Sequence, residues 1–147
     1  MSSNFVYVTF IRTTPEKLWE ALTKPEFMKQ YWFGMHQDSD WKLGSPWALR
    51  FTDGRAADMG DIAEIDPPKR IVINWRNEFR ENFKAEGFTR CTMDLEPQGS
   101  AVKLTISHSI DRPESKIIGA VSGGWPKILS NLKSFLETGE VLFADKY

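Results

Sequence analysis

The chain has 147 residues, with 19 lysines and arginines against 20 aspartates and glutamates and a formal net charge of -1. A chain of this length is expected to form one domain, over residues 1–147, with a full core of its own. The near-neutral charge balance does not support nucleic-acid binding, which calls for a basic surface. Two histidines are too few for a His-rich metal site, and we expect no cofactor.

The first part of the chain predicts one strand and two short helices. Residues Phe5–Arg12 are rich in aromatic and β-branched side chains, which favours a strand. Thr14 and Pro15 mark a helix start, because threonine caps free amide groups and proline loses nothing at the first helical position. The segment Lys24-Pro25-Glu26 begins a second short helix.

Short extended segments follow, and turn residues separate them. His36 falls in a polar loop that we expect to be solvated. Pro67-Pro68 cannot lie within a central strand and therefore marks a turn, and the charged segment Asn77–Glu86 is expected to be an exposed loop. The strands predicted in this part are Trp41–Leu43, Pro46–Phe51, Gly60–Asp66 and Arg70–Asn77.

A hairpin is predicted around the four-residue loop 97–100, between strands 88–96 and 101–110. If Glu96 pairs with Ala101, Asp94 lies across from Lys103, and opposite charges in that position stabilise a sheet. The other face of the hairpin is then mostly apolar and should point inward. It carries Cys91, Met93, Leu95, Val102, Leu104, Ile106 and His108.

The C-terminal part predicts a long helix that ends at Gly139, because glycine is the usual residue after a helix end. Pro126 cannot donate to the carbonyl of Ser122, so we expect a kink or a break there. The apolar residues that recur at helical spacing are Ile117, Ile118, Val121, Trp125, Ile128, Leu129, Leu132, Phe135 and Leu136.

This order of elements resembles the START-like, or SRPBCC, superfamily, and in particular the family named after the activator of the ninety-kilodalton heat-shock protein's ATPase. The resembling motifs are TPEKLWEALTKPEFMKQYWFG, GDIAEIDPPKRIVINW, TRCTMDLEPQGSAVKLTISHSI and GGWPKILSNLKSFLETGE. The resemblance implies an α+β, helix-grip (Bet v 1-like) fold. In that fold a curved antiparallel sheet of about six or seven strands grips the C-terminal helix around an apolar cavity.

Two polar residues are candidates for chemistry. His108 points inward, and Cys91 lies diagonally across the hairpin on the same face, which suggests either a Cys–His nucleophile pair or an inert core cysteine beside a polar group at the cavity rim. Glu64 points inward if Ile65 pairs with Arg70, and otherwise sits at a strand end in solvent.

Gly123 and Gly124 leave space beside Trp125, so an apolar pocket is predicted there, bounded by the sheet and by Trp32 or Phe33. Core packing explains the aromatic residues equally well. The candidate ligand-binding residues are Trp32, Phe33, Trp47, Glu64, Trp75, Met93, His108 and Trp125.

Three functions remain open from the sequence. The first is binding of a small apolar ligand, which the lack of a phosphate loop, an HExxH motif or a nucleophile elbow favours. The second is a cyclase- or hydrolase-type enzyme that uses Glu64 and His108 as acid and base. The third is a co-chaperone of the heat-shock ATPase. We do not expect this partner, because the resemblance implies that full activators carry an additional N-terminal docking domain.

The expected location is the cytoplasm. Cys91 is the only cysteine, so no disulfide can form within the chain. The N-terminus lacks the pattern of a signal peptide, and no apolar stretch is long enough for membrane insertion.

Overall fold

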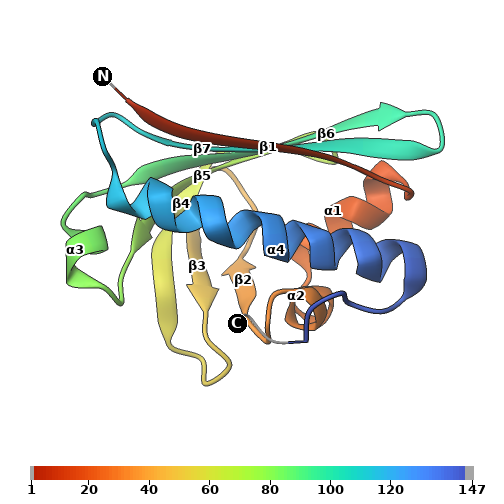
Figure 1. Cartoon of the computed structure of the whole chain (residues 1–147), viewed down its shortest axis with the longest axis horizontal. Helices are drawn as coiled ribbons and strands as arrows, with labels where there is room; N and C mark the ends of the chain where they lie inside the picture. The colour runs from red at the N-terminus through yellow and green to blue at the C-terminus, as the bar shows by residue number, and fades with distance from the viewer. Residues whose placement is uncertain (1, 145–147) are drawn as a thin grey trace.

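The computed structural model of the chain describes residues 2–144. A curved antiparallel sheet lies against one long helix, with strand order β1-β7-β6-β5-β4-β3-β2 (Figure 1). The strands are β1 (Ser3–Ile11), β2 (His36–Ser39), β3 (Pro46–Arg50), β4 (Ala56–Asp66), β5 (Arg70–Asn77), β6 (Thr89–Gln98) and β7 (Ala101–Ile110). The helices are α1 (Pro15–Thr23), α2 (Pro25–Tyr31), α3 (Glu81–Lys84) and α4 (Lys116–Thr138). The helix-grip fold expected from the sequence, with about six or seven strands, is confirmed, and the sheet has seven.

The helix ends follow the predicted signals. The Thr14 hydroxyl accepts a hydrogen bond from the Lys17 amide at 3.2 Å, and Pro15 takes the first position of α1. Gly139 ends α4 in the left-handed conformation, with φ 84°, where a Cβ would be strained. Of the two alternatives expected at Pro126, a kink or a break, the break does not occur, and α4 runs through this proline as one helix.

Two predictions between the helices and β3 are wrong. The strand there is His36–Ser39 and not Trp41–Leu43, so His36 lies half-buried in β2 instead of in a solvated loop. Trp41 has φ 56°, which no strand residue adopts, and its indole donates to the Thr23 carbonyl at 3.1 Å. β2 is held because the Gln37 side chain is fully buried and donates to the Leu22 carbonyl.

The hairpin of β6 and β7 has the predicted faces but a different register. Gln98 pairs with Ala101, so the turn holds only two residues, and its first, Gly99, has φ 66°. Every pairing therefore moves by two residues from the predicted one. Lys103 pairs with Glu96 instead of Asp94, and Cys91 lies directly opposite His108. A two-residue shift keeps each side chain on its face, so hydrophobic alternation alone cannot detect the error.

The core lies on the concave side of the sheet, beneath α1, α2 and α4 (Figure 1). All the apolar hairpin residues predicted to point inward are buried there. Segment 77–86, predicted as an exposed loop, contains the short helix α3, which lies at one end of the sheet near the start of α4. Within residues 2–144, no helix has both the length and the apolar character needed to cross a membrane.

Candidate functional site

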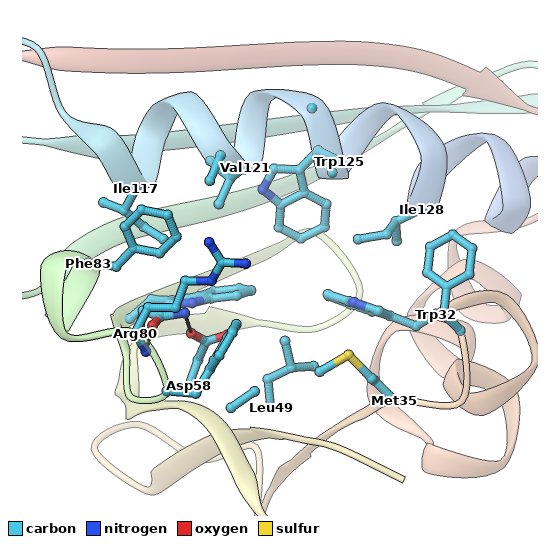
Figure 2. A pocket seen from close by; sticks show the side chains of 18 of the residues that line it. Trp32, Met35, Leu49, Asp58, Arg80, Phe83, Ile117, Val121, Trp125 and Ile128 are labelled. Carbon is cyan, nitrogen blue, oxygen red and sulfur yellow. Dashed lines mark hydrogen bonds between the residues drawn. The ribbon is translucent and has the colours of Figure 1, made fainter. Parts of the chain in front are cut away.

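A pocket of about 380 Å³ opens between the first half of α4 and the sheet (Figure 2). It lies beside Trp125 with Trp32 and Phe33 in its wall, at the position where the sequence predicts one. The other residues that line it come from the sheet, α3 and the segments next to them, and are Met35, Leu49, Phe51, Ala57, Asp58, Trp75, Asn77, Phe79, Arg80 and Phe83. Helix α4 contributes Ile117, Ala120, Val121, Gly123, Gly124, Trp125, Lys127 and Ile128.

The pocket exists because one stripe of α4 carries a glycine where a large side chain would otherwise fill it. Ile117, Val121, Gly124 and Ile128 are three or four residues apart, so they share one face of the helix. A Cβ built on Gly124 meets no atom within 4 Å. The space in front of Gly124 is therefore open and forms part of the pocket.

Three indoles form the inner wall of the pocket. Trp125 makes edge-to-face contacts with Trp32 and Trp75, with ring centroids 5.4 Å and 5.9 Å apart. Trp75 is supported from behind by Trp47, at 4.5 Å. Gly60 pairs with both Trp47 and Trp75 in the neighbouring strands, and a Cβ there would collide with the Asn74 carbonyl oxygen.

His108 supports this wall through hydrogen bonds to Trp125 and, by way of Thr89, to Trp75. The Trp125 indole donates to His108 Nδ1 at 3.2 Å, so Nδ1 is an acceptor and the proton of the neutral ring lies on Nε2. Nε2 then donates to the Thr89 hydroxyl at 2.7 Å, and that hydroxyl donates to the Trp75 carbonyl at 2.9 Å. Burial lowers the pKa of His108 to about 3, so the ring is neutral at physiological pH.

Cys91 lies opposite His108 in the sheet, but the two side chains do not form a nucleophile–base pair. Burial raises the pKa of the Cys91 thiol, so the nucleophilic thiolate is disfavoured. Both nitrogens of His108 are already engaged by Trp125 and Thr89, so the ring is not placed to act as a base for the thiol. Of the two interpretations of this pair, the structure supports the inert core cysteine.

A small polar group interrupts the apolar wall near α3. The buried Asp58 carboxylate accepts from the Asn77 amide at 2.8 Å. The Asn77 side-chain oxygen accepts from the backbone amide of Arg80 at 3.0 Å, which fixes the loop that enters α3. The Arg80 side chain extends from this loop into the pocket toward α4 (Figure 2).

The structure brings half of the predicted site residues together at the pocket. Trp32, Phe33, Trp75 and Trp125 line it. Trp47 and His108 do not line it but support the residues that do, and Met93 is buried in the core with 1% of its surface exposed.

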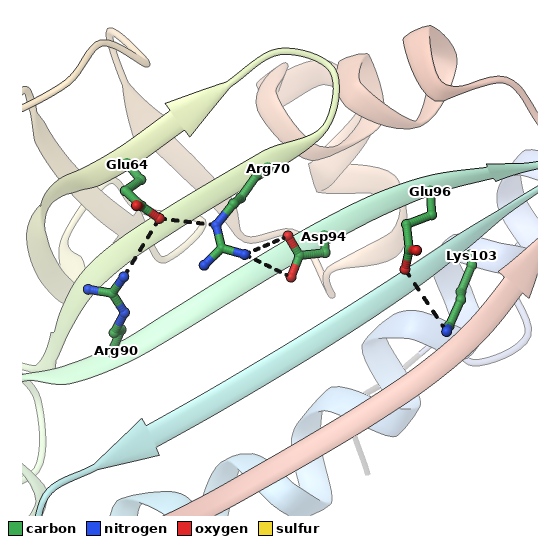
Figure 3. Close-up of polar contacts among 6 residues, drawn as sticks. All are labelled: Glu64, Arg70, Arg90, Asp94, Glu96 and Lys103. Atoms are coloured by element: carbon green, nitrogen blue, oxygen red, sulfur yellow. Dashed lines mark hydrogen bonds and ion pairs between the residues drawn. The ribbon is translucent and has the colours of Figure 1, made fainter.

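Glu64 lies on the outer face of the sheet, so its expected inward position is wrong and the alternative of a carboxylate in solvent is confirmed. A β-bulge between Ile62 and Glu64 shifts the register, so Glu64 pairs with Val72 instead of Ile71 and points outward. Its carboxylate is half exposed and forms ion pairs with Arg70 at 3.0 Å and Arg90 at 3.6 Å (Figure 3). Glu64 and the buried His108 therefore cannot act on one substrate as acid and base.

Sequence reasoning missed the α3 side of the pocket. Phe79, Arg80 and Phe83 lie in the segment that was expected to be an exposed loop. A partial signal was present, because two aromatic residues, Phe79 and Phe83, interrupt the charged stretch, and aromatic side chains favour apolar surroundings. Among the described residues, no group of three or more His, Cys, Asp or Glu side chains is placed to hold a metal ion.

Solved structures with the same fold come from several organisms. MLL2253 from Mesorhizobium loti is 23% identical, with a TM-score of 0.78 over 95% of this chain and 100% of that one. ChR145 from Cytophaga hutchinsonii is 27% identical, with a TM-score of 0.73 over 93% and 95%. PFC0360w, described as an HSP90 activator from Plasmodium falciparum, is 20% identical, with a TM-score of 0.73 over 91% and 96%. These likenesses establish the fold alone.

Comparison with curated proteins finds no match. The sequence model of one family, described as activator of Hsp90 ATPase homolog 1-like protein, matches residues 12–137. That range runs from the end of β1 to the last turn of α4 and includes the whole pocket. The chain therefore belongs to the family of activator of Hsp90 ATPase homolog 1-like proteins.

Proposed function

We propose that the protein binds a small apolar molecule in the pocket between α4 and the sheet. The observation that carries this proposal is the pocket itself, about 380 Å³ in volume and walled by Trp32, Trp75 and Trp125. Its size falls within the range of about 300–1,000 Å³ that is typical of small-molecule sites, which are mostly apolar with a few polar groups. Binding of this kind requires no catalytic residue.

The test uses N-phenyl-1-naphthylamine, an uncharged dye that fluoresces in apolar sites. We expect saturable binding to the wild-type protein and little or none to Gly124→Leu, because leucine would fill the space that Gly124 leaves open. Replacing a helical glycine also favours the helix, so lost binding would not reflect lost folding. Native mass spectrometry of freshly purified protein would show whether a cellular ligand is already bound.

Gly119→Leu is the matched control. Gly119 lies in the same helix, also meets no atom within 4 Å of an added Cβ, and does not line the pocket. This variant should bind the dye like the wild type. Equal dye binding by Gly124→Leu and Gly119→Leu would place the dye elsewhere and contradict the proposal.

Stimulation of the Hsp90 ATPase is a second candidate, and the family description is what favours it. The Plasmodium falciparum activator shares the fold at 20% identity, which carries no function to this chain. ATPase assays with stoichiometric protein separate the two candidates. We expect no appreciable stimulation, and a several-fold increase would establish the co-chaperone function instead.

A further inference from the structure

We infer that the ligand of the pocket carries an anionic group, which Arg80 binds at the α3 side while the apolar body lies against the indoles. This inference rests on the proposed function and names the ligand class, an amphipathic organic acid. Three charged residues line the pocket, and two of them, Arg80 and Lys127, are cationic, against the single carboxylate of Asp58. The charge of the lining is therefore positive.

A hydrogen bond from its amide fixes the backbone of Arg80. Its amide donates to the Asn77 side chain at 3.0 Å, and Asn77 is in turn bonded to the buried Asp58. The guanidinium lies near the rings of Phe79 and Phe83, at 5.8 Å and 5.5 Å from their centroids. Two aromatic neighbours restrict the side chain without occupying its N–H donors, so the donors remain available to a ligand.

Arg80 differs from other arginines of the sheet and its loops. Arg50, Arg55, Arg70, Arg76 and Arg90 each form an ion pair with a carboxylate of the protein. None of the ion pairs found in residues 2–144 involves the Arg80 guanidinium. Because Arg80 instead reaches into an apolar pocket (Figure 2), the geometry suits a carboxylate or sulfonate brought by the ligand.

Two dyes with one aromatic skeleton test the inference. N-phenyl-1-naphthylamine is uncharged, and 8-anilinonaphthalene-1-sulfonate adds one sulfonate to it. Arg80→Gln should weaken binding of the sulfonate by about tenfold and leave the uncharged dye within about twofold, because only the sulfonate loses a charge-assisted hydrogen bond. The dependence of sulfonate binding on salt should fall in the same variant.

Arg90→Gln is the matched control, since it removes the same charge from the outer face of the sheet and should change neither affinity. Equal weakening of both dyes by Arg80→Gln, or an unchanged affinity for the sulfonate, would overturn the inference while the proposed function stands. If neither dye binds the wild-type protein, the proposed function fails as well. Arg80 is exposed, so the variant should fold normally, which circular dichroism checks.

Discussion

The two halves of α4 face the same sheet, but one half is packed in the core and the other borders a pocket. In the C-terminal half, near α1 and α2, Leu129 and Leu132 are 1% and 0% exposed (Figure 1). In the N-terminal half, Val121 and Gly124 border an open pocket. The helix and the sheet are continuous across both halves, so the size of the side chains on the facing stripe decides which half is core and which is a pocket.

The largest effect is expected in the packed half. Leu132→Ala should lower the free energy of unfolding by about 2–5 kcal/mol, because it leaves a void in a fully buried site. Val121→Ala, in the pocket half, should cost about 1 kcal/mol or less, since its side chain already borders empty space. Urea unfolding measures both, and equal costs would show that the two halves are packed alike.

The next effect is a dependence of the protein's stability on pH, and it arises from His108 behind the pocket wall. The pKa of His108 is lowered to about 3 in the folded protein, whereas an unfolded histidine has a pKa near 6.5. The unfolded chain therefore binds the extra proton first. Stability from this group is complete above pH 6.5 and is lost as pH falls toward 3, by at most about 1.4 kcal/mol per pH unit.

NMR titration separates His108 from the other histidine. The His108 ring should keep its neutral chemical shifts down to about pH 4. His36 is less buried, although burial and the charge of Lys29 also lower its pKa, so it should titrate first as the pH falls. Protonation of His108 near pH 6.5 would contradict the buried network that joins it to Trp125.

A smaller effect is expected where the pocket wall meets this network. Trp125→Phe keeps an aromatic ring but removes the donor to His108 Nδ1, which leaves a buried acceptor unpaired. The cost should be about 1–3 kcal/mol. An apolar ligand should also change tryptophan fluorescence less in this variant than in the wild type, as titration with N-phenyl-1-naphthylamine would show. An unchanged fluorescence response would place the ligand away from Trp125.

The smallest effect is expected away from both halves of α4, on the outer face of the sheet. Glu64→Gln should change the free energy of unfolding by less than about 1 kcal/mol, because its ion pairs with Arg70 and Arg90 are about half exposed. It should leave dye binding unchanged, because Glu64 does not line the pocket. Loss of binding in this variant would contradict the orientation that the β-bulge gives Glu64.

Local signals in the sequence determined the start of α1, the end of α4 and the inner faces of β6 and β7. Thr14 and Gly139 bound their helices through contacts within a few residues, and the alternation in β6 and β7 assigns every side chain to its face. Gly124 beside Trp125 located the pocket, because an absent side chain in an apolar stripe is visible in the sequence itself. These features depend on neighbours along the chain, and so they were predicted correctly.

Only the tertiary structure decided the register and the polar part of the site. The two-residue turn at Gly99 and the bulge before Glu64 depend on which residues meet across strands, and alternation does not report either. Arg80 reaches the pocket because Asn77, bonded to Asp58 on the neighbouring strand, fixes the loop that enters α3. A contact between distant segments leaves no periodic signal, so residues of this kind emerge only when the chain is folded.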